Sequence, residues 1–217
     1  MGADLPPSKW SFPSPIDAEP EGPVALGGDL DPSTLVEAYR GGLFPMPLGR
    51  SGELGWFSPD PRAVLPADAM HTSRTLRRSM RSMEISVDLA FREVMVACGD
   101  PRRPHGWITE DFVDAYTRLH QLGWAHSVEV WVDGELAGGV YGVAIGDFFA
   151  GESMFHRVTD ASKAALVGLV ELMQRCATPL IDVQWSTPHL ASLGTIEIPR
   201  AQYLSVLAHS VEGRGPW

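Results

Sequence analysis

The feature that most constrains the fold is the stretch HSVEVWVDGELAGGVYGVAI, at residues 126–145, which has the pattern of a β-hairpin. Apolar residues, many of them β-branched, flank the dipeptide Asp133-Gly134 on both sides. Asp-Gly is a favoured two-residue turn between antiparallel strands. The sequence therefore predicts a β-sheet with an antiparallel hairpin at its centre.

Patterns typical of helices and strands alternate before and after the hairpin. Phe91, Val94, Met95 and Cys98 recur at helical spacing, and Asp88 is expected to cap that helix. Further helices are expected at about 72–82, after Thr109, at about 160–176 and after Pro199, and strands at 84–88 and 180–185. This order predicts a mixed α/β sheet with helices on both faces.

The first part of the chain has a different character. Residues 1 to about 30 are rich in proline and glycine and are expected to be irregular. A short helix follows, with Asp31 as its N-cap, Pro32 in its first turn and Gly41 after its end. Residues 42–61 are expected to form loops and turns. We therefore expect a small N-terminal domain over 1–61, with little core of its own, and a larger domain over 62–217.

The composition narrows the classes of protein that are possible. The 217 residues carry a formal net charge of −10, which excludes a protein that coats nucleic acids through a general positive field. The two cysteines, Cys98 and Cys176, are far apart and are expected to be reduced core residues. The sequence has no recognisable signal peptide or membrane-spanning stretch, so a soluble cytoplasmic protein is expected.

Positive charge is concentrated in SRTLRRSMR, at residues 73–81. Arg74, Arg77, Arg78 and Arg81 follow the i, i+3, i+4, i+7 spacing, which places all of them on one face of a helix. A solvated helix face is the simpler interpretation, but such faces usually mix both signs of charge. We favour an anionic partner, because the planar guanidinium group binds two phosphate oxygens at once.

Motifs for nucleotide hydrolysis, dinucleotide binding, zinc proteolysis and a serine nucleophile are absent, so neither a metal nor a cofactor is expected. Glu152 stands among aromatic residues in FFAGESMF, at 148–155, where an unpartnered carboxylate is costly and suggests a functional site. An exposed glutamate at a sheet edge is nearly as well supported. Asp182 and Gln184 are two residues apart in a strand and face the same side. For that strand alone, a solvated face is the favoured interpretation.

Nine motifs resemble, in the same order, those of bacterial leucyl/phenylalanyl-tRNA–protein transferases. They are EGPVALGGDLDPSTLVEAYRGGLFP, WFSPDPRAVL, GWIT, AHSVEVW, GGVYGVAIG, FFAGESMF, DASKAAL, LIDVQ and SLGTIEIPR, and the resemblance covers about residues 12–204. It implies an acetyltransferase-like catalytic domain that moves Leu or Phe, and Met less well, from aminoacyl-tRNA to proteins that begin with Arg or Lys. It also implies that these proteins are thereby marked for degradation.

The resemblance implies roles for individual residues as well. The positions for catalysis and for the incoming N-terminus are matched by Glu152, Asp182 and Gln184. The positions around the aminoacyl pocket are matched by Val140, Phe149 and Met154, and the tRNA-binding positions by Arg74, Arg77, Arg78 and Arg81. Trp107 and Tyr116 match the region that binds the terminal adenosine. Met46 stands where the family usually has a tryptophan suspected of stacking on the adenine, and Trp56 is the candidate to replace that ring.

Two other functions remain open on the sequence. An acyl-CoA N-acyltransferase of the same fold needs a pyrophosphate-binding loop of the form Q/R-x-x-G-x-G/A, which is not found. A non-catalytic tRNA-binding protein needs no catalytic carboxylates, so Glu152 and the Asp182–Gln184 pair argue against it. The expected partners are aminoacyl-tRNA carrying Leu, Phe or Met and an acceptor with N-terminal Arg or Lys. The protein is expected to act as a monomer and away from membranes.

Overall fold

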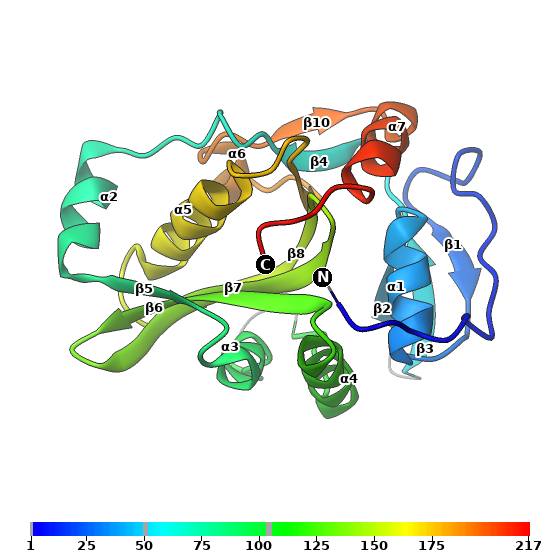
Figure 1. Ribbon diagram of the computed structural model, residues 1–217, viewed down its shortest axis with the longest axis horizontal. Coiled ribbons are helices and arrows are strands. Elements are labelled where there is room, and N and C mark those ends of the chain that lie inside the picture. The colour runs from blue at the N-terminus through cyan, green and yellow to red at the C-terminus, as the bar shows by residue number, and fades with distance from the viewer. Residues whose placement is uncertain (1, 50–51, 103–105) are drawn as a thin grey trace.

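Two β-sheets organise the chain in the computed structural model, which describes residues 2–49, 52–102 and 106–217 (Figure 1). The smaller sheet has antiparallel strands in the order β1-β3-β2, which are β1 Pro23–Leu26, β2 Phe44–Leu48 and β3 Glu53–Phe57. Helix α1, Pro32–Arg40, begins after Asp31, ends at Gly41 as predicted, and packs on β2.

The prediction of loops and turns over residues 42–61 is wrong, because β2 and β3 lie there. Pro45 and Pro47 interrupt the strand pattern in the sequence, yet β2 is an edge strand of the small sheet. An edge strand tolerates proline because one row of its backbone groups has no partner strand. Gly55, which also weakens the pattern, pairs with Met46 inside this sheet.

The larger sheet has its strands in the order β10-β4-β9-β8-β7-β6-β5. These strands are β4 Arg62–Leu65, β5 Glu84–Val87, β6 Ala125–Val132, β7 Glu135–Ile145, β8 Phe148–His156, β9 Leu180–Gln184 and β10 Ile196–Ile198. Among the described strands, β8 and β9 run parallel and the other neighbours run antiparallel. The predicted hairpin is confirmed as β6–β7, and its turn residues Asp133 and Gly134 both have positive φ.

Helices cover both faces of the larger sheet, so the predicted mixed α/β class is confirmed. Helix α5, Ala161–Met173, packs on β6, β7 and β8 from one face, and α3, Phe91–Cys98, and α4, Glu110–Gln121, pack on the other (Figure 1). The remaining helical elements are α2 Arg74–Ser79, the short 3-10 turn η1 Met80–Ser82, α6 Pro188–Ala191 and α7 Arg200–Ser210.

The N-terminal part packs on the rest of the chain through α1, which contacts α4 and β7. Leu35 and Tyr39 of α1 belong to the same buried hydrophobic cluster as Phe112 and Tyr116 of α4. A second cluster lies under α5 and includes the fully buried Leu169. The predicted boundary between residues 61 and 62 falls between the two sheets, and a division into two domains stays a prediction.

The predicted cap of α3 is wrong, because this helix begins after Ala90 and not after Asp88. Asp88 has a φ of +60° and directs its carboxylate to β6, where it accepts the backbone N–H of Ser127 at 2.9 Å and contacts His126 Nδ1 at 2.7 Å. Aspartate is one of the few residues that adopts this left-handed conformation readily. Asp88 therefore stands before the helix because its carboxylate contacts β6, and it does not cap α3.

None of the helices in the described ranges is long and apolar enough to cross a membrane. Cys98 is buried, which confirms its predicted core position, whereas Cys176 is half-buried at the margin of the cluster under α5. Neither cysteine forms a disulfide within the described part of the chain.

Candidate functional site

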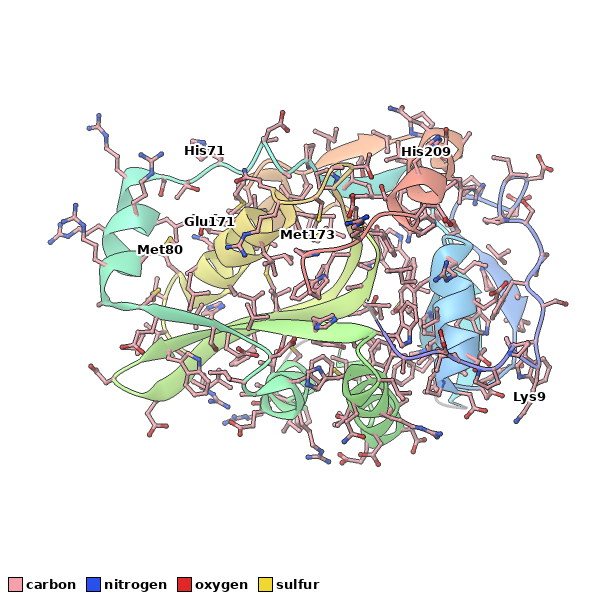
Figure 2. The ribbon with its side chains drawn as sticks, in the orientation of Figure 1. Lys9, His71, Met80, Glu171, Met173 and His209 are labelled. Atoms are coloured by element: carbon pink, nitrogen blue, oxygen red, sulfur yellow. The ribbon has the colours of Figure 1, made fainter. Side chains whose placement is uncertain are left out.

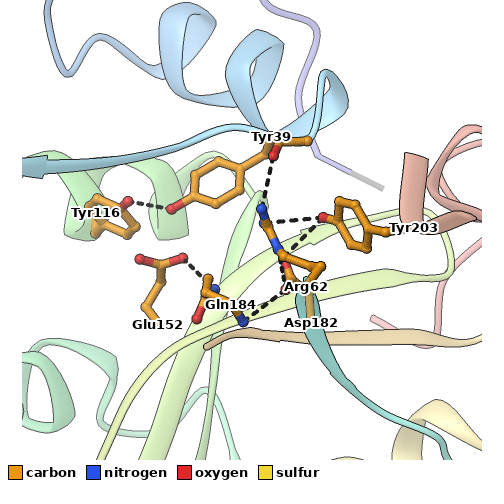
Figure 3. Close-up of polar contacts among 8 residues, drawn as sticks. Tyr39, Arg62, Tyr116, Glu152, Asp182, Gln184 and Tyr203 are labelled. Atoms are coloured by element: carbon orange, nitrogen blue, oxygen red, sulfur yellow. Dashed lines mark hydrogen bonds and ion pairs between the residues drawn. The ribbon is translucent and has the colours of Figure 1, made fainter. Parts of the chain in front are cut away.

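A fully buried ion pair joins β4 to β9 (Figure 3). The side chains of Arg62 and Asp182 are 1% and 0% exposed, and their two hydrogen bonds run from Nε to Oδ1 at 2.8 Å and from Nη2 to Oδ2 at 2.6 Å. Tyr203 of α7 donates its hydroxyl to Oδ2 at 3.0 Å, and Arg62 Nη1 donates to the carbonyl of Gly42 at 3.1 Å. Buried charges are tolerated when they are both paired and hydrogen-bonded, and both conditions are met.

The pair fixes the charges at the centre of the site. Burial alone lowers the pKa of Arg62, but the adjacent Asp182 carboxylate raises it above its usual range. Burial also raises the pKa of the Tyr203 phenol well above its ordinary value. Arg62 therefore carries a permanent positive charge, which the Asp182 carboxylate neutralises, and Tyr203 is uncharged.

Gln184, at the end of β9, has a strained backbone. Its φ is +59°, a value that is uncommon for residues other than glycine, and Trp185 N donates across it to the carbonyl of Val183 at 2.7 Å. The Asp182 carboxylate stabilises this turn by accepting the backbone N–H of Gln184 at 2.9 Å. Strain of this kind persists where the surroundings enforce it, and it clusters at functional sites.

Glu152 stands at an irregularity in the pairing of β7 with β8. Consecutive residues of β7 pair with Gly151 and Ser153, so Glu152 is the extra residue of a β-bulge. The bulge aims the half-buried carboxyl group at Gln184, whose Nε2 lies 3.5 Å from Glu152 Oε1 (Figure 3). Because β8 lies inside the sheet, the alternative of a glutamate at an exposed sheet edge does not hold.

The surroundings of Glu152 favour its protonated form. Burial raises the pKa of Glu152 from its ordinary value of 4.5 to about 8. A hydrogen bond with Tyr39 and the charge of Arg62 oppose this shift, whereas the charge of Asp182 adds to it. The Tyr39 hydroxyl lies 2.6 Å from that of Tyr116, so a chain of phenols leads from Glu152 into the interior (Figure 3).

Two cavities meet at these polar groups. The wide cavity, of about 410 Å³, is lined largely by aromatic and apolar side chains that include Phe44, Met46, Trp107 and Trp185. The narrow cavity, of about 110 Å³, is lined mainly by apolar side chains that include Val140, Met154, Leu166, Leu169 and Ile181. The residues that border both cavities are Glu152, Ser153, Val183, Gln184 and Leu190.

Several residues singled out in the sequence therefore lie together. Met46 and Trp107 line the wide cavity, and Val140 and Met154, which are paired across β7 and β8, line the narrow one. Phe149 and Tyr116, expected at the aminoacyl pocket and at the adenosine, are fully buried and line neither cavity. The favoured interpretation of the β9 strand, a solvated face, is wrong, because Asp182 and Gln184 are both buried.

Trp56 lies away from both cavities. Its side chain is 1% exposed, it packs edge-on against Phe12 with ring centroids 4.7 Å apart, and its Nε1 donates to the carbonyl of Gly27 at 2.7 Å. A ring buried in this way is not available to stack on a base. The candidate replacement for a tryptophan at the position of Met46 is therefore excluded by its packing.

The residues of the site that sequence reasoning missed include Tyr39, Arg62, Trp185 and Tyr203. A local signal exists for Arg62, which opens the otherwise apolar strand RAVL, where an unpaired charge is not tolerated. Trp185 follows Gln184 directly and is 42% exposed. The two tyrosines carry no local signal, because their hydroxyl partners come from distant segments.

The arginine-rich stretch forms α2 and η1, which confirms a helix over most of the predicted range. Its four arginines are all exposed, and among the described residues no ion pair involves them. Figure 2 shows nitrogen-bearing side chains extending outward from α2, while Met80 lies between α2 and α5. The segment that leads to α2 runs beside the site, because His71 N donates to Leu193 O just after α6.

Asp88, His120 and His126 place possible metal-ligating atoms within 4.8 Å of one another. Hydrogen bonds account for this cluster, since His126 Nδ1 lies 2.7 Å from Asp88 and His120 Nδ1 lies 2.8 Å from the carbonyl of Ala125. A carbonyl oxygen only accepts, so the latter nitrogen carries a proton and does not bind a metal. The cluster borders neither the wide nor the narrow cavity.

Comparisons with known proteins match this chain over most of its length. The family profile described as leucyl/phenylalanyl-tRNA protein transferase matches residues 64–208, and the profile of that family's N-terminal domain matches residues 28–60. The chain belongs to the leucyl/phenylalanyl-tRNA–protein transferase family. The resemblance found in the nine sequence motifs is thereby confirmed.

Relatives that bear the transferase name are similar across almost the whole chain. One from Idiomarina loihiensis is 46% identical over 95% of this chain and 90% of the relative. Another, from Nitrosomonas europaea, is 52% identical over 85% of this chain and 80% of the relative. A third, from Aromatoleum aromaticum, is 47% identical over 98% of this chain and 90% of the relative.

Solved structures similar to this transferase are more distant. A GCN5-related N-acetyltransferase-like protein from Streptococcus suis has a TM-score of 0.34 and 15% identity, over 76% of this chain and 64% of that one. The structure of L-PGS from Bacillus licheniformis has a TM-score of 0.37 and 13% identity, over 72% of this chain and 54% of that one. Similarity at this level carries no argument about fold or function.

Replacing Arg62 by methionine is expected to destabilise this transferase strongly. The change leaves the Asp182 carboxylate buried without its cation, which costs about 3–5 kcal/mol of the free energy of unfolding. Urea denaturation measures the loss. The matched control is Arg92→Ala, because Arg92 forms an exposed ion pair with Glu110 at 2.7 Å, and its loss should cost less than about 1 kcal/mol. Equal losses in the two variants would contradict the prediction.

The raised pKa of Glu152 predicts that stability depends on pH differently in the wild type and in Glu152→Gln. The folded protein keeps the Glu152 proton up to a pKa of about 8, whereas the unfolded chain loses it near 4.5. The stabilisation by this proton is therefore full below the lower value and is lost as pH rises through the upper one. Between these values, the free energy of unfolding of the wild type should fall relative to that of Glu152→Gln. A difference that stays constant with pH would show that folding does not raise the pKa of Glu152.

Proposed function

We propose that the chain transfers leucine or phenylalanine, and methionine less well, from aminoacyl-tRNA to the α-amino group of proteins that begin with Arg or Lys. The transfer marks these proteins for degradation. Family membership supports the reaction, and its assignment to this site rests on one observation, the meeting of two cavities at Glu152 and Gln184. We expect a monomer that works in the cytoplasm.

The two cavities suit the two parts of the donor. The narrow cavity accepts an apolar side chain, and Met154 in its wall is flexible enough to adapt to leucine or phenylalanine. Such a pocket separates apolar side chains only modestly. The wide cavity accepts the terminal nucleoside, with Trp107 as a ring on which the base stacks. The ester that joins these parts then lies where the cavities meet.

The main task of the protein in this reaction is to position the amine against the ester. The neutral amine attacks the ester carbonyl, a C–N bond forms, the C–O bond to the ribose breaks, and the proton lost by the amine ends on the ribose oxygen. The ester is already activated, so alignment of the reactants and a path for this proton are the main requirements. The groups at the junction of the cavities supply both.

Asp182 acts as a positioning residue in this proposal. Its Oδ1 accepts from Arg62 and from the backbone of Gln184, and its Oδ2 accepts from Arg62 and Tyr203. Neither oxygen is therefore available to take a proton from the amine. The carboxylate holds the strained turn that presents the side-chain amide of Gln184, which orients the reacting carbonyl or amine.

Glu152 is the group that moves the proton. Its pKa of about 8 is close to that of an α-amino group, roughly 7.7–8.0. Proton exchange between the two is therefore nearly balanced, which is the condition that favours general acid–base catalysis. The ionised form of Glu152 accepts the proton of the attacking amine and passes it to the departing ribose oxygen.

The exposed arginines of α2 and η1 bind the phosphate backbone of the tRNA. All four lie on the surface of a segment whose approach runs beside α6, and α6 contributes Leu190 to both cavities. The backbone contacts position the donor and carry no sequence information. In an acidic protein, this local patch is what attracts a polyanion.

Transfer of labelled leucine from Leu-tRNA to two peptides, identical except for an N-terminal Arg or Ala, tests the proposed reaction. We expect label on the Arg peptide alone. Glu152→Gln should lower kcat by about 100-fold or more, because one amide replaces the group that moves the proton. Glu171→Gln, which changes an exposed glutamate on α5 (Figure 2), is the matched control and should be neutral. Binding of Leu-tRNA without labelling of either peptide would instead favour a non-catalytic tRNA-binding protein.

Reversing the charge of Arg77 and Arg78 to Glu should weaken tRNA binding without unfolding the protein. About four phosphate contacts predict that log K falls against log salt with a slope of roughly −3 to −4 in the wild type. The double variant should flatten this slope, as measured by filter binding over a range of salt concentrations. Arg118→Glu with Arg175→Glu reverses two exposed arginines outside α2 and keeps the net charge matched. Equal weakening in both double variants would mean that α2 is not the binding patch.

A further inference from the structure

The two cavities offer little negative charge to the Arg or Lys side chain at the acceptor's N-terminus. Among the described residues that border the wide or the narrow cavity, Glu152 is the one acidic side chain, and no lysine or arginine is present. Glu152 already contacts Gln184 and Tyr39, and burial keeps it mostly protonated at neutral pH. A group that serves the reacting amine is poorly suited to hold a second cation at the same time. Discrimination of Arg and Lys from neutral residues therefore needs another partner.

Trp185 presents an aromatic surface at the required place. Its side chain lines the wide cavity and is 42% exposed, although a large apolar ring gains most when it is covered. Its ring meets that of Phe44 at 4.9 Å and 89° and that of Phe57 at 6.4 Å and 61°. Phe44 is in turn fixed by Arg62, whose guanidinium lies 4.9 Å from its ring centroid. The indole thus packs against two aromatic rings while part of its surface stays open.

The backbone places this ring within one residue of the chemistry. Consecutive Cα atoms are 3.8 Å apart, and Trp185 directly follows Gln184, which borders both cavities. The tight turn at Gln184 is closed by the 2.7 Å hydrogen bond from Trp185 N to Val183 O, which fixes the backbone that carries the ring. The acceptor's α-amino group attacks where the two cavities meet. The side chain of its first residue, Arg or Lys, is long enough to reach from there to the ring of Trp185.

We propose that the open face of Trp185 binds the side chain of the acceptor's N-terminal Arg or Lys by a cation–π contact and thereby determines acceptor specificity. Arg and Lys are the side chains that an indole attracts most strongly through its ring face. A neutral N-terminal residue gains no such attraction, so the same peptide without the charge is discriminated against. This inference rests on the proposed function, because it assigns the acceptor part of the same site.

The alternative for an aromatic ring in this cavity is a stacked base of the tRNA. Trp107 already offers a ring for that purpose from a different segment, where it packs edge-on against Phe112 of α4 at 5.3 Å. Trp185 differs because it is joined to Gln184 and leans on the aromatic residues of the small sheet. Its attachment to the polar junction favours the acceptor over the base.

The test compares peptides that begin with Arg, Lys or citrulline, which has the shape of Arg without its charge. In steady-state transfer from Leu-tRNA, Trp185→Leu should raise KM for the Arg peptide about tenfold and leave kcat and the KM for Leu-tRNA unchanged. The preference for Arg over citrulline should shrink toward one, and Trp185→Phe should keep an intermediate preference. Trp10→Leu, at a tryptophan that is 48% exposed and does not line the wide cavity, is the matched control and should be neutral.

Equilibrium binding of the same peptides to the protein without tRNA separates this inference from the proposed reaction. If the wild type transfers nothing but binds Arg over citrulline in a manner that Trp185→Leu abolishes, the reaction fails and the acceptor site stands. Loss of Arg and citrulline binding in equal measure overturns the cation–π assignment. A raised KM for Leu-tRNA in Trp185→Leu, with the peptide preference intact, assigns the ring to the base and also overturns it.

Discussion

The site depends on one interaction, the buried ion pair between Arg62 and Asp182. Arg62 reaches the carbonyl of Gly42 after α1, the carboxylate of β9 and the hydroxyl of Tyr203 on α7, so one guanidinium ties the N-terminal part to the sheet and to the last helix. A buried pair of this kind adds little net stability compared with an apolar pair of equal size. What it provides is geometry, since all of these segments must be in place before either charge is satisfied.

The functional groups lie where the regular sheet is interrupted. Glu152 is the extra residue of a bulge in β8, and Gln184 ends β9 with a positive φ and a turn that Asp182 holds. The two strands run parallel and pair only over Phe148–Ala150 and Leu180–Asp182, so the polar residues just beyond face a space that no backbone pairing fills. The cavities form there because the strands separate while α5 and β7 keep packing around them.

Local patterns in the sequence predicted much of the fold but only part of the site. The β6–β7 hairpin, α3 and α4 follow from turn chemistry and from apolar spacing, both of which are properties of neighbouring residues. The strand β2 was missed because prolines obscure an edge strand, and Trp56 was misjudged because its burial depends on Phe12 and Gly27. Arg62 and Tyr203 are separated by 141 residues, and their partnership through Asp182 exists only once the sheet and α7 have assembled.

The two carboxyl groups of the site differ because their surroundings differ. Asp182 has a cation, a phenol and a backbone N–H, and with its charge neutralised it serves as a rigid support. Glu152 contacts the side-chain amide of Gln184 but has no cation paired with it in the described part of the chain, and burial raises its pKa to about 8. In the proposed reaction Glu152 moves the proton and Asp182 holds the geometry, so the surroundings of each carboxyl group decide its role.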